Sequence, residues 1–167
     1  MPRQSRQSTT KRATTQTARI GGVRKVIKTR ADGKVTITDA LPLEWELQAA
    51  QCRALRDMPE YGKQFLFAGD QNAAKRGQTA SAQAKAAGMT AGEPDLRIYL
   101  KGGRLGLIEN KVGRAALEPS QVTRHPALAA LGHPVVVVRA VTEDDAAAQA
   151  VALVRKWLAG NDNEPSC

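Results

Sequence analysis

The chain is 167 residues long, which allows one domain with a sizeable hydrophobic core and little else. Its 42% of hydrophobic and 25% of charged residues are typical of a soluble globular protein, and its 4% of aromatic residues argues against a platform of exposed rings for single-stranded bases. The formal net charge of +9 comes from residues 1–34, which hold ten Lys or Arg and one acid, whereas residues 35–167 hold fifteen of each sign.

No segment approaches the roughly 18 apolar residues of a membrane span, and the N-terminal segment lacks the apolar core of a signal peptide. The two cysteines, Cys52 and Cys167, make no disulfide framework. We therefore expect an intracellular, cytoplasmic protein in a reducing environment, not a secreted one.

Residues 1–22 are polar and basic, show no periodicity and end in Gly21-Gly22, which predicts a disordered basic arm. Such an arm on a neutral domain would attract phosphates without reading base sequence, and salt would weaken the attraction. The alternative is a tail that only adds solubility. The candidate nucleic-acid contacts in this part of the chain are Arg12, Arg19, Arg24, Lys25 and Lys28.

Residues 23–40 suggest a short β-hairpin extension. Val23–Thr29 and Val35–Thr38 are rich in β-branched residues, and the Asp32-Gly33 step between them favours a tight turn. An extended, solvated segment is an equal alternative.

A helix is predicted over Leu43–Met58, where apolar residues recur at helical spacing before Pro59. Trp45, Ala49 and Cys52 form a second apolar line on the far side. We therefore expect both faces of this helix to be covered, with Trp45 in the core.

Several shorter elements follow. Residues 65–68 are an apolar run that predicts a buried strand, and residues 77–88, rich in Ala, Gln and Ser, predict a helix or a helical lid. Residues 95–100 and 105–112 predict two strands that are joined by a tight turn at 101–104.

The last third of the chain predicts a helix, a strand and a helix. The first helix begins at Glu118-Pro119, and Pro126 within it removes one backbone hydrogen bond and should kink or split it. A strand over 135–138 and a helix over 146–158 follow, and residues 161–167 look frayed. The order helix, strand, strand, strand, helix, strand, helix predicts one α/β domain over residues 41–160, with a mixed sheet.

Three polar residues lie where strand patterns call for apolar ones. Asp95 opens one predicted strand, and Glu109 and Lys111 lie in the strand after the turn. Because strand side chains alternate, Glu109 and Lys111 share one face, with Cα atoms about 6.5–7 Å apart. Hairpin pairing can bring Asp95 alongside them, although the register is not readable from the sequence.

Two carboxylates and a lysine in this arrangement suit hydrolysis of phosphodiesters. Carboxylate oxygens bind a hard cation such as Mg²⁺ or Mn²⁺, which lowers the pKa of a bound water and stabilises charge in the transition state. Lys111 should stay protonated beside a metal-bound glutamate, which favours electrostatic help over general-base action. Each residue by itself has a plainer interpretation, a turn residue for Asp95 and a solvated strand face for the other two.

Taken together, Pro94-Asp95, the Gly102-Gly103 turn, Glu109-Asn110-Lys111 and the following Gln121 resemble the PD-(D/E)xK nuclease superfamily, and more closely its VRR-NUC branch. The resemblance covers about residues 65–138. It implies a restriction-endonuclease-like core of the order αβββαβα, with a mixed central sheet flanked by helices.

The resemblance also implies roles for individual residues. Asp95 and Glu109 would bind the metal together with the backbone carbonyl of Asn110, and Gln121 would support the site. A glutamate of the first helix would complete it. Glu44, which is followed by Gln48, fits the family spacing, and Glu46 is the fallback. Asn110 stands where the family usually has an apolar residue, so its side chain needs a partner or water.

The function that the resemblance implies is a divalent-metal-dependent endonuclease for structured or branched DNA, in phage or bacterial biology. A homodimer and a helicase or replication partner are expected by analogy only. Lys75 and Arg76 are candidate contacts to the DNA backbone, with a solvated face as the alternative. His125 near Pro126 suits a structural or exposed role better than proton transfer.

Two other functions stay open. One is a nucleic-acid-binding protein without catalysis, and the other is an accessory subunit whose Ala-rich residues 73–91 dock a partner. The presence of Asp95, Glu109 and Lys111 together favours the enzyme.

Overall fold

The structure is a computed structural model, and it describes residues 12–21, 23–70 and 78–160. The chain divides into two compact units, Met1–Leu41 and Pro42–Cys167.

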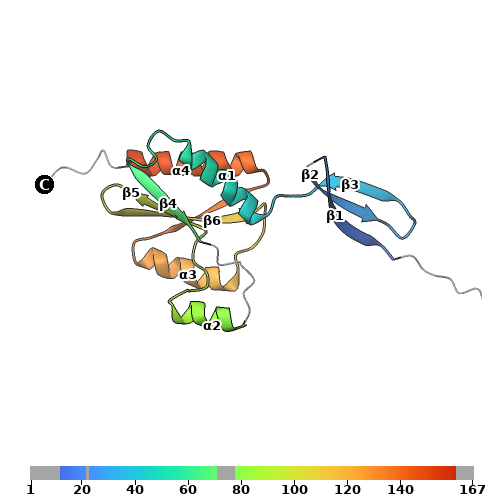
Figure 1. Ribbon diagram of the computed structural model, residues 1–167, viewed down its shortest axis with the longest axis horizontal. Coiled ribbons are helices and arrows are strands. Elements are labelled where there is room, and N and C mark those ends of the chain that lie inside the picture. The colour runs from blue at the N-terminus through green and yellow to red at the C-terminus, as the bar shows by residue number, and fades with distance from the viewer. Residues whose placement is uncertain (1–11, 22, 71–77, 161–167) are drawn as a thin grey trace, which may run out of the picture. The chain divides into compact units, whose positions relative to one another are not determined.

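The first unit is a three-stranded antiparallel sheet of β1 (Thr14–Ile20), β2 (Val23–Thr29) and β3 (Val35–Asp39) (Figure 1). At the turn between β2 and β3, Gly33 has a φ of +85° and the Asp32 carboxylate accepts a 2.9 Å hydrogen bond from the Lys34 N–H. The hairpin that the sequence suggested over residues 23–40 is therefore present.

Residues 1–22 were expected to form a disordered arm. In the structure, Thr14–Ile20 of this segment form the strand β1. This strand pairs with β2 along its whole length, from Thr14 opposite Thr29 to Ile20 opposite Val23. Apart from half-buried Ala18, β1 is exposed, so ladder hydrogen bonds hold it and no buried apolar pattern marks it in the sequence. The rest of the predicted arm, residues 1–11 and 22, and the predicted frayed end, residues 161–167, lie outside the described residues.

The register sorts the side chains of this sheet onto two faces, because directly opposed residues of antiparallel strands share a face. Arg19 lies opposite Arg24, and Lys28 lies opposite Thr15 and Thr36. These residues form what we call the basic face. The opposite face carries apolar residues and the ion pair between Lys25 and Asp39.

The second unit is built on a four-stranded mixed sheet in the order β4 (Phe65–Gly69), β5 (Leu96–Leu100), β6 (Arg104–Val112) and β7 (Val135–Ala140). The first two pairings are antiparallel, and β6 pairs with β7 in parallel. The parallel pair has the helical crossover connection that such strands need.

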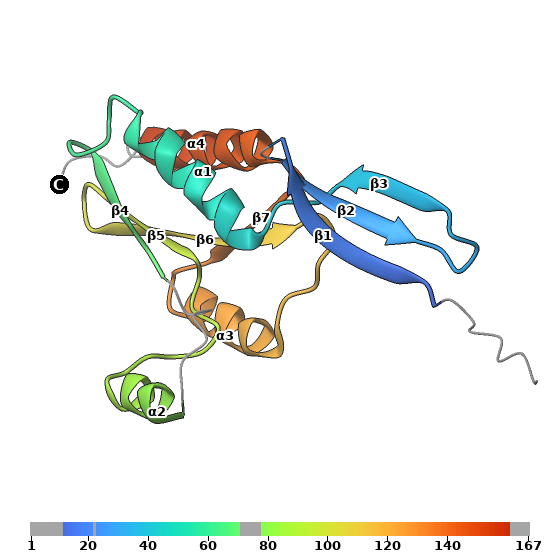
Figure 2. The same cartoon turned by 45° about the vertical axis from the view of Figure 1, so that its right-hand side comes forward.

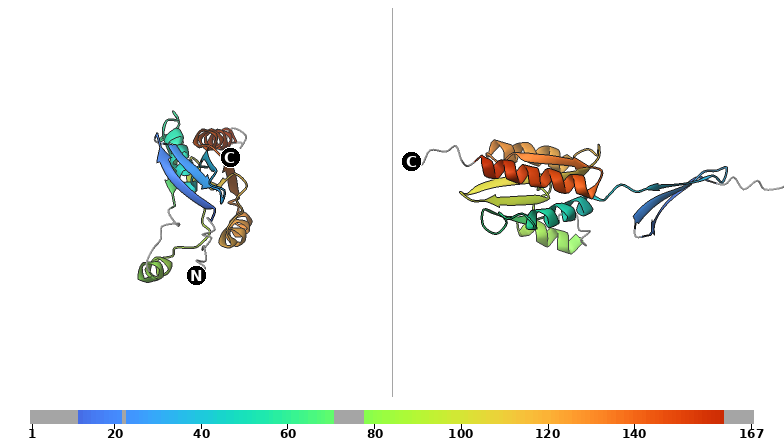
Figure 3. Two further views of the ribbon diagram at one scale, coloured as in Figure 1. Left: turned by 90° about the vertical axis from the view of Figure 1, so that its right-hand side faces the viewer. Right: turned by 90° about the horizontal axis from the view of Figure 1, so that it is seen from above.

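Helices cover both faces of this sheet (Figures 1 and 2). On one face α1 (Glu44–Arg56) and α4 (Glu143–Ala159) lie side by side, as the right-hand view of Figure 3 also shows, and on the other lies α3 (Pro119–Ala130). The fourth helix, α2 (Gln78–Ala86), stands below α3 in Figure 1. The main core joins α1, the sheet and α4 through residues that include Leu55, Ile98, Ile108, Val138 and Val154.

The predicted α/β class with a mixed sheet is confirmed, and the helix predicted over residues 77–88 is present as α2, between the first two strands of the sheet. Pro126 does not split α3, because the backbone bond that it removes would have ended at Val122, on an exposed part of the helix that water can reach. Within the described residues, the second unit has no helix that is long and apolar enough to cross a membrane, and the first has no helix.

The expectation that α1 is covered on both faces is wrong at Trp45, which is 60% exposed. Leu47 and Leu55 take the core face of the helix. Ala49 and Cys52, on the same line as Trp45, border an open cleft instead of a second layer of core.

Candidate active site

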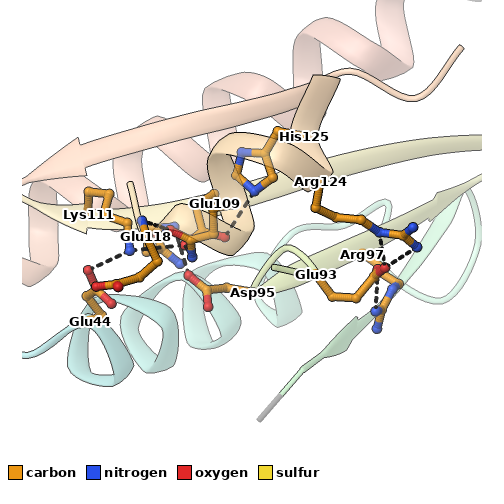
Figure 4. Close-up of polar contacts among 11 residues, drawn as sticks. Glu44, Glu93, Asp95, Arg97, Glu109, Lys111, Glu118, Arg124 and His125 are labelled. Atoms are coloured by element: carbon orange, nitrogen blue, oxygen red, sulfur yellow. Dashed lines mark hydrogen bonds and ion pairs between the residues drawn. The ribbon is translucent and has the colours of Figure 1, made fainter. Parts of the chain in front are cut away.

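Strand alternation on β6 places Glu109 and Lys111 on the sheet face that α3 covers, and both are buried, with 1% and 2% of their surface exposed. Asp95 immediately precedes β5, where Leu96 pairs with Ile108. This register brings Asp95 beside the Glu109 end of the pair, and the Asp95 carboxylate accepts a 2.8 Å hydrogen bond from the Asn110 N–H. Figure 4 shows the three side chains pointing toward one another.

Of the two candidate carboxylates of α1, Glu44 lies beside Lys111 and Glu46 does not. The Lys111 ammonium lies 3.0 Å from a Glu44 oxygen and 3.2 Å from a Glu109 oxygen, so it bridges α1 and β6. Glu46 is occupied elsewhere, since its carboxylate accepts a 2.7 Å hydrogen bond from the Leu43 N–H at the start of α1. We call Glu44, Asp95, Glu109 and Lys111 the candidate site.

Two residues of α3 contact Glu109. Gln121 donates from Nε2 to one carboxylate oxygen of Glu109, and its own carbonyl accepts from the Glu118 N–H at 2.8 Å. His125, one helical turn on, places Nε2 3.7 Å from the other carboxylate oxygen (Figure 4). That oxygen and His125 Nε2 are both buried, and neither has a hydrogen-bond partner among the described residues. One oxygen of Glu109 therefore lacks a donor in a place where such an atom is costly.

Burial and neighbouring negative charge disfavour ionisation of the two central carboxylates. Burial raises the pKa of Glu109 from 4.5 to about 7, and the charge of Asp95 adds to this effect. Burial also raises the pKa of Asp95, against the opposing effect of the Asn110 N–H, and Glu44 adds to the rise. A cation placed between the two carboxylates would stabilise the ionised form of each.

The pKa values of Lys111 and His125 are shifted in opposite directions. Burial alone would lower the pKa of Lys111, but the hydrogen bonds and charges of Glu44 and Glu109 outweigh it and the net pKa is raised, so Lys111 is an ammonium at neutral pH. Burial lowers the pKa of His125, and the charge of Lys111 lowers it further, which favours neutral imidazole.

Two glutamines of α1 donate hydrogen bonds to residues in or beside the site. Gln48 donates to the Asp95 carbonyl at 2.9 Å, and Gln51 donates to the Asn110 side-chain carbonyl at 2.8 Å. Asn110 is fully buried on the opposite face of β6 from Glu109, and its side-chain oxygen has a partner, whereas its side-chain NH2 has none among the described residues.

Glu93 ties the loop before Asp95 to two other elements. One of its oxygens accepts from Arg124 Nε on α3 at 2.7 Å, and the other lies 3.0 Å from Arg97 on β5 (Figure 4). Arg97 also pairs with Asp70 at 2.8 Å. Although burial opposes it, this set of hydrogen bonds and charges lowers the pKa of Glu93.

Gly92 allows this loop to approach α3. Its φ is +84°, and a Cβ at this position would lie 2.5 Å from the Ser120 carbonyl oxygen. For the nuclease activity that the sequence predicts, Gly92→Ala is therefore expected to lower the rate about tenfold or more by displacing Asp95, in addition to the loss of about 1–3 kcal/mol of stability that positive φ imposes. Gly88→Ala is the matched control, because Gly88 has a φ of +89° and nothing within 4 Å of its Cβ position. Equal cleavage by the two variants, compared in thermal unfolding and rate assays, would contradict the role of Gly92.

A divalent cation fits the donors of the candidate site. Asp95 and Glu109 offer carboxylate oxygens, and one buried Glu109 oxygen has no donor within the described chain. Among the described residues no three His, Cys, Asp or Glu side chains form a ready cage. Mg²⁺ commonly takes one or two carboxylates and completes its shell with water and substrate oxygens.

An open cleft of about 1030 Å³ lies over the candidate site. Its walls come from α1, α2, the loop before Asp95 and the start of α3. Asp95, Glu109 and Lys111 all border it, so the buried carboxylates can be reached by a ligand in the cleft.

Comparison with protein-family models, curated proteins and solved structures finds no match to this chain.

The predicted nucleic-acid contacts are placed unevenly. Arg19, Arg24 and Lys28 belong to the basic face of the first unit, whereas Lys25 lies on its opposite face. Arg12 precedes β1 and is exposed. The remaining two, Lys75 and Arg76, lie outside the described residues.

Two residues of this region, Gln51 and Glu93, were not predicted from the sequence, and His125 was expected only in a structural or exposed role. His125 had a signal, since it follows Gln121 by four residues and must share its helix face. Gln51 had one too, as a polar residue in line with the core positions Leu47 and Leu55. Glu93 had none, because its role depends on the approach of Arg124 from a distant helix.

Proposed function

We propose that this chain is a divalent-metal-dependent nuclease with a restriction-endonuclease-like core of the VRR-NUC type. The observation that carries the proposal is the convergence of Asp95, from the loop before β5, with Glu109 and Lys111 of β6 at the floor of one open cleft. Buried charges of this kind are costly for stability, so their clustering in a cleft favours a catalytic role over a structural one.

Asp95 and Glu109 would hold the metal, with the Asn110 carbonyl as a further oxygen ligand. When bound, the cation would polarise the phosphodiester and lower the pKa of a coordinated water. Lys111, held as an ammonium by two carboxylates, would offset charge on the phosphate. Gln121 orients the Glu109 carboxylate by its hydrogen bond, and Glu44 orients Lys111 from α1.

The experiment that tests the proposal is incubation of the purified chain with labelled duplex, single-strand, flap and four-way DNA and with RNA. Each substrate is given Mg²⁺, Mn²⁺ or EDTA. We expect cleavage of DNA with the metals and none with EDTA, most strongly on branched substrates. Binding without cleavage of any substrate would instead support a nucleic-acid-binding protein without catalysis.

The basic face of the first unit is the proposed nucleic-acid contact. Replacing Lys28 of this face by Gln should make the plot of log affinity against log salt shallower, by about one if the variant neutralises one phosphate fewer. Lys25→Gln is the matched control, because Lys25 is on the opposite face and is paired with Asp39. A salt slope that changes equally in both proteins, measured by fluorescence anisotropy, would argue for general charge attraction and against this face.

A further inference from the structure

Trp45 is the most unexpected large side chain of the second unit. It is 60% exposed on the first turn of α1, although tryptophan is usually well buried. It borders the cleft over the candidate site, and Ala49, Cys52 and Arg56 continue its line along the cleft wall at helical spacing.

The position of Trp45 relative to the candidate site is fixed by α1. Its neighbour Glu44 reaches Lys111 at 3.0 Å, and Gln48, one turn on, holds the Asp95 carbonyl. One face of this helix therefore supports the candidate site while the adjoining line of side chains forms the wall of the same cleft. A phosphodiester at the candidate site would place its flanking nucleotides along that wall.

From this arrangement we infer that Trp45 stacks on a nucleobase of the substrate next to the cleaved phosphate, and that the cleft takes an unpaired nucleotide. A base inside an intact duplex has both of its faces covered by its neighbours, so only an unpaired or splayed base can stack on the ring. This inference rests on the proposed function and adds the substrate class, DNA with a single-stranded segment at the cleavage site.

The low aromatic content agrees with this inference. A single exposed ring beside the site supplies one base contact, whereas a single-strand-binding platform needs several. Arg56, further along the wall, lies 5.2 Å from the centre of the Phe67 ring and offers a cation toward the same cleft. The cleft thus combines the exposed ring of Trp45, the cation of Arg56 and the carboxylates of the candidate site.

Fluorescence of the full chain tests the inference, because the sequence has only two tryptophans. Trp157 packs against Gly106 and the core, so subtracting the spectrum of Trp45→Phe from that of the wild type isolates Trp45. The probes are a short oligothymidylate, the same oligomer with an abasic position, and a duplex of equal length, all titrated in EDTA. Cleavage kinetics on a flap substrate are measured in parallel with Mg²⁺.

We expect the oligothymidylate to quench Trp45 in a saturable way, with the duplex and the abasic oligomer quenching it much less. Trp45→Ala should weaken oligothymidylate binding about tenfold, within the range of one stacked base, and raise KM for the flap more than it lowers kcat. Trp45→Phe should recover most of this loss. Tyr99→Ala, which removes another exposed ring that does not border the cleft, should bind and cleave as the wild type does.

Three results would overturn the inference. They are unchanged Trp45 fluorescence while the oligomer binds, equal quenching by duplex and single strand, and weak acrylamide quenching of Trp45 in the free chain, which would mean that the ring is covered. In each case loss of cleavage in Asp95→Asn would leave the proposed function intact, whereas wild-type cleavage by that variant would remove the proposed function itself.

Discussion

Asp95→Asn is expected to lower cleavage of DNA by on the order of 10³-fold or more, while the fold and the affinity for DNA change little. The substitution keeps the shape of the side chain and removes a negative charge from the position that would bind the cation, so charge in the transition state loses its stabilisation. Because burial raises the pKa of Asp95, its charge is unfavourable in the free protein, and the variant should be no less stable than the wild type.

Single-turnover rates with saturating enzyme measure this effect, and circular dichroism and anisotropy check the fold and the binding. Asp144→Asn is the matched control, an identical chemical change at an exposed position in the first turn of α4. The cleavage rates of Glu109→Gln and Lys111→Met should be lowered as that of Asp95→Asn is. If all three retained the wild-type rate, the assignment of catalysis to this site would be wrong.

Stability in EDTA is expected to fall as the pH rises from about 4.5 to 7, contrary to the usual behaviour of carboxylates. The pKa of Glu109 is raised from 4.5 to about 7, so the folded chain holds its proton more tightly than the unfolded chain does. The stability that this proton contributes is complete below 4.5 and is lost through about 7, and the shift corresponds to about 3 kcal/mol. The raised pKa of Asp95 acts in the same direction.

Glu109→Gln removes most of this dependence and should be more stable than the wild type at pH 8 in EDTA. The lowered pKa of His125 works the other way, because neutral imidazole in the folded chain favours folding as the pH rises through 6.5. The free energy of unfolding of the variant should therefore stay constant or rise slightly as the pH increases. Urea unfolding across this pH range measures it, and a wild-type stability that rises steadily to pH 8 would contradict the raised pKa of Glu109.

The central residues of the site could be predicted from the sequence because they break a local rule. Asp95, Glu109 and Lys111 put charges where strands want apolar side chains, and strand alternation alone places Glu109 and Lys111 on one face. The pairing of Leu96 with Ile108, which brings Asp95 to them, depends on a register that the sequence does not specify.

Other features could not be predicted from the sequence because they depend on residues that are distant along the chain. Glu44 and Glu46 are equivalent in the sequence, and only the positions of Lys111 and the Leu43 N–H separate them. The helical spacing of Trp45 predicts a core position, yet 60% of its surface is exposed among the described residues. The strand β1 is held by backbone pairing with β2 and lacks the buried apolar residues that make strands recognisable.

Calorimetric titration of the DNA-free chain with Mn²⁺ and Mg²⁺ is the most direct measurement of whether Asp95 and Glu109 form a cation site. We expect saturable binding to the wild type that releases protons near neutral pH, as a carboxyl with a pKa of about 7 ionises on binding. The heat of binding should disappear in Asp95→Asn and in Glu109→Gln, and remain in Asp144→Asn. Undiminished binding of the metals in the first two variants would contradict the site.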